Sequence, residues 1–135
     1  SEFNIKKEDK FVVPEDCAYE VVWTFDRSSG NNSLTLANSE NERLVITYDV
    51  NTNMLLLDRR QSGWTDHGFA QVAKAPLKSM EPSNITVSIF IDKSSAEVFC
   101  ENGLTTLTST IFPSRPYRDL TTSRNSVVKC FKLLA

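Results

Sequence analysis

Alternation of apolar and polar residues is the feature that most constrains the fold of this chain. Apolar side chains recur at every second position in several windows, of which 19–26, 44–49 and 85–92 are the clearest. Such a period is typical of strands that bury one face against a core. No window longer than about one turn shows the period of a helix. We therefore predict an all-β chain.

Turn-forming residues separate these windows at short intervals. They are Ser29-Gly30-Asn31-Asn32, Val50-Asn51-Thr52-Asn53, Lys93-Ser94-Ser95 and Asn102-Gly103. Asn102-Gly103 is the strongest hairpin signal, because both central residues of a type I′ turn need a positive φ, which Asn and Gly tolerate. Residues 61–82 and 113–126 are less regular, so we expect long loops there, followed by a last strand at 127–134.

Many short antiparallel strands between closely spaced turns indicate a β-sandwich or a barrel. We favour an antiparallel β-sandwich of two sheets, a jelly roll of the concanavalin or lectin type, because several strands carry Thr, Ser or charge on the face opposite the apolar one. The length of 135 residues suits one domain. We assign residues 17–135 to this domain and residues 1–16 to an N-terminal extension or linker.

The composition excludes several kinds of site. Lys plus Arg is 15 and Asp plus Glu is 17, a net charge of -2, which gives no general attraction to nucleic acid or anionic lipid. One His, and three Cys without a CxxC motif, are a poor supply of zinc ligands. No apolar run is long enough to span a membrane. We expect no metal, cofactor, nucleic acid or membrane partner.

The cysteines, Cys17, Cys100 and Cys130, lie far apart in the sequence. We interpret them as buried structural thiols, which is the common state of a free cysteine. One disulfide plus a free thiol is the alternative, and spacing alone does not indicate which pair would form it.

Catalytic chemistry finds little support among these residues. A glycosidase needs two carboxyl groups roughly 5–10 Å apart, and carboxylates at strand ends more often accept hydrogen bonds from turns. The carboxylates considered are Asp26, Asp49, Asp58, Asp92 and Glu97. The single histidine, His67, adjoins Asp66 without a GxSxG nucleophile elbow, so we interpret it as a loop residue. We predict no catalytic residue.

A sugar-binding site is harder to dismiss, because such sites combine an aromatic face with a few fixed polar groups. Trp64 stands in the stretch QSGWTDHGF between two glycines, where an exposed ring is plausible, although packing is the favoured interpretation. Trp23 lies within an alternating window and is predicted to belong to the core.

Two arginines at the end of a strand, Arg59 and Arg60, are further candidates. A guanidinium group presents a fork of donors that suits paired hydroxyls or a carboxylate. An ion pair with Asp58, Asp92 or Glu97 is the alternative and the more frequent case.

Two segments taken together resemble a known family. They are NMLLLDRRQSG and, further along the chain, ITVSIFIDKSSAEVFCENGLTTLTSTIFP. They resemble the C-terminal β-sandwich module of glycoside hydrolase family 32, which includes levanases, inulinases and invertases. The matching motifs are Leu57-Asp58-Arg59, Ser62-Gly63, Asp92-Lys93-Ser94-Ser95, Glu97-Val98-Phe99, Asn102-Gly103 and Ile111-Phe112-Pro113. The resemblance extends from about Tyr19 to the end.

The resemblance does not reach the catalytic residues of that family. Its catalytic module resembles a five-bladed propeller with an N-D-P-N-G nucleophile motif, an R-D-P motif and an E-C acid/base motif, and none of these occurs here. Cys100-Glu101 has the reverse order of the last motif. The resemblance therefore implies an accessory module of a fructan-degrading hydrolase.

The DKSSAEVF segment has a structural and a functional interpretation. Asp92 and Ser94 can cap the turn with side-chain hydrogen bonds. Alternation places Glu97 and Phe99 on one face, where Arg59 is a natural partner for Glu97. We favour an ion pair that fixes the sheet packing. The alternative is a polar pocket for a terminal fructose, since related modules of carbohydrate-binding family 66 resemble this fold and bind fructan ends.

Our leading expectation is a non-catalytic module that packs against the propeller of its parent enzyme, stabilises it and contributes to dimer contacts, and is secreted, periplasmic or on the cell surface with it. The second is a fructan-binding module that uses Arg59, Glu97, Asp26 and Trp64. The third is a protein interaction module unrelated to sugar.

Overall fold

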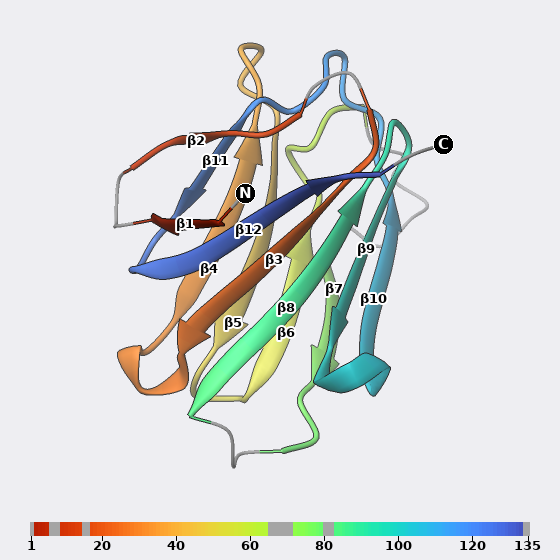
Figure 1. Cartoon of the computed structure of the whole chain (residues 1–135). Helices are drawn as coiled ribbons and strands as arrows, with labels where there is room; N and C mark the ends of the chain where they lie inside the picture. The colour runs from red at the N-terminus through yellow and green to blue at the C-terminus, as the bar shows by residue number, and fades with distance from the viewer. Residues whose placement is uncertain (1, 6–8, 15–16, 65–71, 80–82, 134–135) are drawn as a thin grey trace.

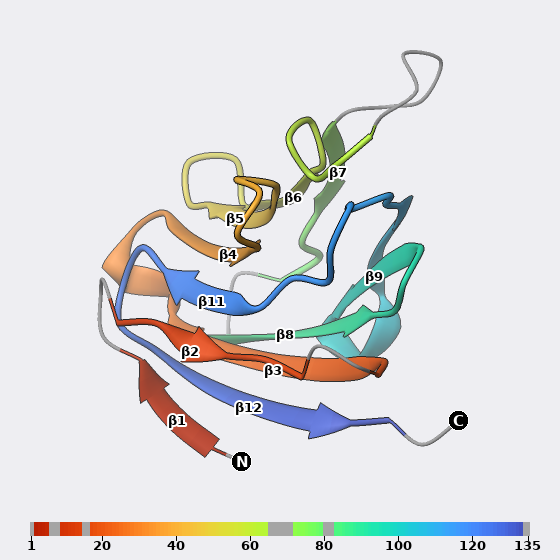
Figure 2. The ribbon, with the colours of Figure 1, turned by 90° about the horizontal axis from the view of Figure 1, so that it is seen from above.

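The computed structural model describes residues 2–5, 9–14, 17–64, 72–79 and 83–133. They form two antiparallel sheets, which Figure 2 shows as separate layers. Sheet A consists, in spatial order, of β1 (Glu2–Ile5), β12 (Ser126–Lys132), β3 (Tyr19–Asp26), β8 (Asn84–Ile91), β9 (Ser95–Cys100) and β10 (Thr105–Thr110). Sheet B consists of β2 (Phe11–Val12), β11 (Asp119–Thr122), β4 (Asn32–Ala37), β5 (Arg43–Asp49), β6 (Met54–Asp58) and β7 (Val72–Pro76). The predicted two-sheet sandwich is confirmed.

The sheets pack through the apolar residues that alternate along each strand. In β3, every second side chain from Tyr19 to Phe25 is buried, and the same rule holds along β5 and β8. Trp23 lies at the centre, fully buried as predicted, with its indole N–H donating to Ser126 Oγ at 2.9 Å. Figure 1 shows β12, β3 and β8 side by side in front of β5 and β6.

Three parts of the chain differ from the sequence-based expectation. Residues 1–16, which we assigned to an extension or linker, supply β1 to sheet A and β2 to sheet B. The expected loops contain β7 and β11. These strands are short, and β7 exposes Lys74 and carries Pro76, so its alternation is weak and its place comes from pairing with β6.

The hairpin predicted at Asn102-Gly103 joins β9 to β10, and both residues have the expected positive φ, 56° and 90°. The connection is longer than the two-residue loop of a type I′ turn. Glu101 also has a positive φ of 55°, and the short 3-10 segment η2 (Glu101–Gly103) is followed by Leu104 as its C-cap. A second such segment, η1 (Arg27–Ser29), follows β3.

In the described part of the chain, no helix has the length and apolar character that a membrane crossing requires. The three cysteines are free thiols, with Cys100 and Cys130 buried and Cys17 half-buried. Burial of Cys100 and Cys130 agrees with the interpretation as structural thiols.

Candidate functional site

The four residues predicted to bind sugar lie in different parts of the sandwich. Arg59 follows β6, is only 2% exposed, and donates from Nη1 to the backbone carbonyl of Thr110 at 3.1 Å. It continues the inward alternation of the buried Leu55 and Leu57. Glu97 lies on the outer, half-buried face of β9. The side chains of Arg59 and Glu97 thus belong to opposite faces.

The predicted ion pair between Arg59 and Glu97 is therefore not found. Among the described residues, the ion pairs are Asp58–Arg60 at 2.7 Å and Glu40–Arg115 at 3.3 Å. The alternative, an arginine paired with Asp58, is confirmed for Arg60. Hydrogen bonds from the Arg60 side chain hold the pKa of Asp58 below its ordinary value.

Asp26 lies at the end of β3, far from both Arg59 and Glu97. Its carboxylate accepts from the backbone N–H of Ser28 at 2.9 Å and from the Ser28 hydroxyl at 2.8 Å, which lowers its pKa. It pairs with Asn84 at the first residue of β8, whereas Arg59 lies near the other end of that strand. An eight-residue strand is about 25 Å long, so Asp26 and Arg59 cannot share a monosaccharide.

Trp64 lies close to the Arg59 end of the molecule. It is 63% exposed and meets the ring of Phe112 edge-on, with 5.6 Å between ring centroids. The backbone N–H of Trp64 donates to the Phe112 carbonyl at 3.1 Å. Trp64 is thus an exposed loop residue and not part of the core. His67 and Asp66 lie outside the described residues.

Several motifs of the resemblance meet at this same end. Ser62 is buried and donates from Oγ to the Arg59 carbonyl at 2.7 Å, while its own carbonyl accepts from the Tyr117 hydroxyl at 2.6 Å. Gly63 has a φ of 144° and packs so closely on Phe112 and the following proline that a Cβ would collide with their backbone. The LDRxxSG stretch and the IFP stretch are therefore adjacent in space, with Gly63 of the first packed against Phe112 of the second.

The turn after β8 completes this cluster. Asp92 Oδ1 accepts from the backbone N–H of Ser94 at 2.9 Å, and from the backbone N–H and hydroxyl of Ser95 at 2.8 Å and 3.0 Å. The carbonyl of Ser94 in turn accepts from Ile111 N–H at 3.0 Å. Asp92 caps the turn as expected, but the hydroxyl that bonds to it is that of Ser95. At this end Arg59, Ser62 and Asp92 each form a hydrogen bond within the chain, and Gly63 packs on Phe112.

A cavity of about 450 Å³ lies next to this cluster, between the start of β3 and the loop before β11. Two buried tyrosines line it, and burial raises the pKa of both. The hydroxyl of Tyr117 donates to Ser62, whereas the hydroxyl of Tyr19 has no hydrogen-bond partner among the residues that the structure describes. Tyr19 is only 3% exposed, so its hydroxyl is a buried polar group without compensation.

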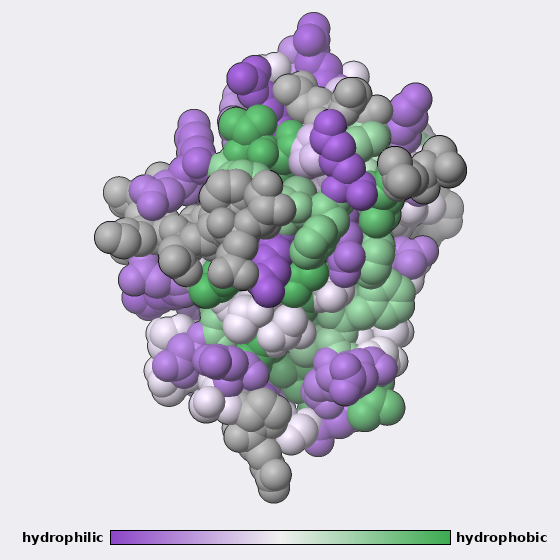
Figure 3. Space-filling view, viewed as in Figure 1, coloured by the Kyte–Doolittle hydropathy of each residue, from purple (hydrophilic) through white to green (hydrophobic). Residues whose placement is uncertain are grey.

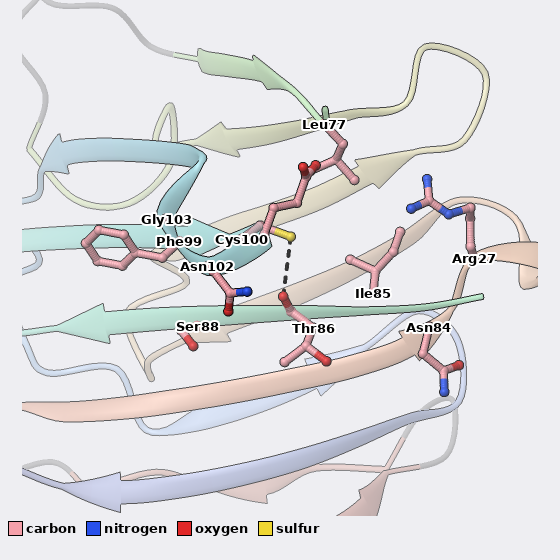
Figure 4. A pocket seen from close by; sticks show the side chains of 11 residues that line it. Arg27, Leu77, Asn84, Ile85, Thr86, Ser88, Phe99, Cys100, Asn102 and Gly103 are labelled. Carbon is pink, nitrogen blue, oxygen red and sulfur yellow. Dashed lines mark hydrogen bonds between the residues drawn. The ribbon is translucent and has the colours of Figure 1, made fainter. Parts of the chain in front are cut away.

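The opposite end of the sandwich carries a smaller and more polar pocket of about 280 Å³, shown in Figure 4. Its walls are the outward face of β8, the end of β9 and the η2 turn. The polar and aromatic side chains that line it include Asn84, Ser88, Phe99 and Asn102. The binding site predicted from the sequence did not include these four residues, because outward polar residues on a strand are typical of an ordinary solvent-exposed face.

Two charged residues fix the walls of this pocket. The guanidinium of Arg27 donates to Asn53 Oδ1 at 2.6 Å and to the Tyr48 hydroxyl at 3.2 Å. Glu101 accepts from the backbone N–H of Lys78 at 2.5 Å, which ties η2 to the segment after β7. Cys100 donates from Sγ to the Thr86 carbonyl at 3.3 Å, and burial raises the pKa of its thiol to about 11.

Potential metal ligands are scattered over the described part of the chain. Across the described ranges, no three His, Cys, Asp or Glu residues stand close enough together to bind a metal ion. The carboxylates at the ends of strands are instead engaged by their own turns.

Comparison with known proteins gives a consistent result. The family model described as "Glycosyl hydrolases family 32 C terminal" matches residues 2–133. The extracellular exo-inulinase of Aspergillus awamori is 43% identical over 75 residues, 54% of this chain and 14% of the relative. The sucrose-6-phosphate hydrolase of Streptococcus mutans is 32% identical over 96 residues, 71% of this chain and 20% of the relative.

A solved structure extends the likeness to nearly the whole chain. The crystal structure of the Aspergillus awamori exo-inulinase superposes with a TM-score of 0.81 at 28% identity. The match covers 99% of this chain but only 28% of the exo-inulinase chain. The chain thus covers 14% to 28% of the length of these relatives.

Proposed function

Because this chain belongs to the family of C-terminal domains of family 32 glycosyl hydrolases, we propose that it is the non-catalytic sandwich module of a fructan-cleaving enzyme of the levanase, inulinase or invertase type. One observation carries the proposal: the chain matches 28% of an exo-inulinase over almost its entire own length. The remainder of such an enzyme is large enough for a separate catalytic domain. The parent enzyme would cleave β-fructosidic bonds with retention, using two carboxylates outside this module.

The carboxylates of this chain support a non-catalytic role. A glycosidase needs a general acid whose pKa is raised above that of an ordinary carboxyl group. Hydrogen bonds instead hold the pKa of Asp26, Asp58 and Asp92 below the ordinary value. The sequence also lacks the N-D-P-N-G, R-D-P and E-C motifs of the catalytic propeller.

The role that follows is to pack on the propeller, raise its stability and contribute to contacts within a dimer. Sheet A offers apolar surface for such contacts, since Val22 and Phe90 lie half-buried on its outer face. Figure 3 shows this face, with apolar residues exposed between polar ones. Secretion with the parent enzyme is supported by the extracellular exo-inulinases among the relatives.

Two measurements test the proposal. The purified chain should release no reducing sugar from sucrose, inulin or levan, whereas hydrolysis by the chain alone would overturn a non-catalytic role. The catalytic part of the parent enzyme, produced separately, should gain thermal stability when this chain is added. Absence of any gain, with both parts folded, would contradict the supporting role.

Carbohydrate binding is the second candidate function, and the pocket of Figure 4 is the observation that favours it. It groups an aromatic ring with neutral polar side chains, the combination typical of sugar sites. The four residues predicted from the sequence are a weaker basis, because the structure separates Asp26 and Glu97 from Arg59.

A further inference from the structure

We propose that the pocket between β8 and η2 binds one neutral monosaccharide unit through Asn84, Ser88, Asn102 and the ring of Phe99. That this unit is a terminal fructosyl residue rests on the proposed function of the parent enzyme. The site is distinct from the motif cluster at Arg59 and Trp64, which lies at the other end of the sandwich.

Three polar side chains in the pocket have unused hydrogen-bonding capacity. Within the described residues, the side chains of Asn84, Ser88 and Asn102 make no hydrogen bond, although all three line the pocket. An amide and a hydroxyl each offer both a donor and an acceptor. A sugar hydroxyl also donates and accepts, so these groups match a polyol ligand.

The charged groups around the pocket are already engaged, which favours a neutral ligand. Arg27 donates to Tyr48, to Asn53 and to the Ser79 carbonyl at 3.1 Å. The carboxylate of Glu101 accepts from Lys78 N–H. An anionic ligand would have to displace these contacts, whereas a neutral sugar needs only the amides and the hydroxyl.

Phe99 supplies the apolar surface that a sugar ring needs for its C–H groups. It lies directly opposite Ser88 in the β8–β9 pairing, and its ring meets Phe90 edge-on at 5.6 Å. This contact fixes the orientation of the ring. In Figure 4, Phe99 lies at one end of the pocket and Asn84 and Arg27 at the other, with Ser88 and Asn102 between them.

The η2 turn holds Asn102 over β8 in a conformation that costs free energy. Glu101 and Asn102 have φ values of 55° and 56°, which are sparsely populated by residues with a side chain. The bond from Lys78 to Glu101, and that from Leu104 N–H to the Glu101 carbonyl at 3.2 Å, keep the turn in place. The backbone that carries Asn102 is thus held in place before a ligand arrives.

The size of the pocket sets the length of the ligand. Small-molecule sites usually enclose about 300 to 1,000 Å³, and this pocket holds about 280 Å³. The volume suits one sugar unit at the end of a chain. An internal stretch of polysaccharide would extend beyond it.

NMR titration of the ¹⁵N-labelled chain with D-fructose and with the trisaccharide 1-kestose tests the site. Saturable shifts should appear at the amides of Ser88, Phe99 and Asn102, with glucose binding more weakly. Asn102→Gly and Ser88→Ala should each weaken binding about tenfold. The first variant removes the side chain at a positive φ without adding strain, so it should stay folded.

A matched variant keeps the result interpretable. Asn51→Ala removes an exposed amide in the β5–β6 turn and should leave the affinity unchanged. The site would be refuted if neither sugar gave saturable shifts, if the shifts centred on Trp64, or if Asn102→Gly bound like the parent chain. Failure here would leave the supporting role intact, because the stability test of the propeller does not depend on sugar binding.

Discussion

The hydroxyl of Tyr117 donates a hydrogen bond of 2.6 Å to the buried carbonyl of Ser62. This bond joins the loop before β11 to the loop after β6, within the cluster of family motifs. Tyr19 lines the same cavity, but its hydroxyl has no hydrogen-bond partner within the described part of the chain. The two tyrosines therefore form a natural pair for measuring the value of one buried hydrogen bond.

Tyr117→Phe should lower the free energy of unfolding by about 1–2 kcal/mol, because the Ser62 carbonyl loses its donor. Tyr19→Phe should leave the stability unchanged or raise it, since the substitution removes a buried hydroxyl that is not compensated. Urea denaturation followed by tryptophan fluorescence measures both. Equal losses in the two variants would show that Tyr19 also has a partner.

Gly63→Ala should be strongly destabilising, by about 3 kcal/mol or more, because it adds both a strained φ and a collision with the Phe112 backbone. Gly30→Ala is the control. Gly30 also has a positive φ, 93°, but no atom lies within 4 Å of a Cβ there, so its loss should be about 1 kcal/mol. Thermal unfolding that ranks the two variants equally would rule out the close contact as the cause.

Arg59 and Arg60 should respond differently to replacement despite being neighbours. Arg59→Ala removes a buried side chain and its bond to Thr110, and should cost about 2–4 kcal/mol. Arg60→Ala breaks an exposed ion pair with Asp58, and such pairs contribute little. Chemical denaturation of both variants gives the comparison. A larger effect of Arg60→Ala would contradict the assigned burial.

The carboxylate of Asp92 should make the free energy of unfolding depend on pH in the acidic range. Three hydrogen bonds, led by that from Ser94 N–H, hold the pKa of this carboxyl below its ordinary value of 3.8. A lowered pKa adds stability above the ordinary value, and this stability is lost as the pH falls through the folded-state pKa. Asp92→Asn should therefore lose less stability than the parent chain between roughly pH 5 and pH 2. Parallel curves would show that the charge of Asp92 contributes nothing.

Alkylation should distinguish the cysteines. The pKa of Cys100 is raised to about 11 by burial, so only about one thiol in a thousand is a thiolate at pH 8. Cys17 is half-buried and should react first with iodoacetamide, whereas Cys100 should react on the timescale of unfolding. Mass spectrometry of timed samples locates the label. Rapid modification of Cys100 in the folded chain would contradict its burial.

The sequence predicted the buried faces of the main strands because alternation is a local property. Tyr19, Trp23 and Ile89 face the core as their positions indicate. The strands β7 and β11 were missed, since their alternation is short and their stability comes from partners distant in the sequence. Pairing with a distant strand leaves no pattern within the short segment itself from which the strand could be predicted.

The candidate sites were less predictable than the fold. Arg59 was expected to meet Glu97, but it continues the inward parity of Leu55 and Leu57, a signal that was present in the sequence. The pocket at Ser88 and Asn102 depends on how η2 turns back over β8, which no spacing reveals. Sequence periodicity thus indicates which face of a strand is buried. Only the structure shows which residues from different strands come together in a site.

The place of β12 has a consequence for the order in which the chain folds. This strand is the last in the sequence, yet it lies between β1 and β3 and pairs with both. On the ribosome, β3, β8, β9 and β10 can pair in the order in which they emerge, but β1 cannot join sheet A until residues 126–132 are available. Until then β3 has an open edge, which is a site for mispairing with other chains. Pairing of segments this distant in the sequence also slows folding. A nascent chain would therefore benefit from a protein that covers the free edge of β3 until β12 pairs with it.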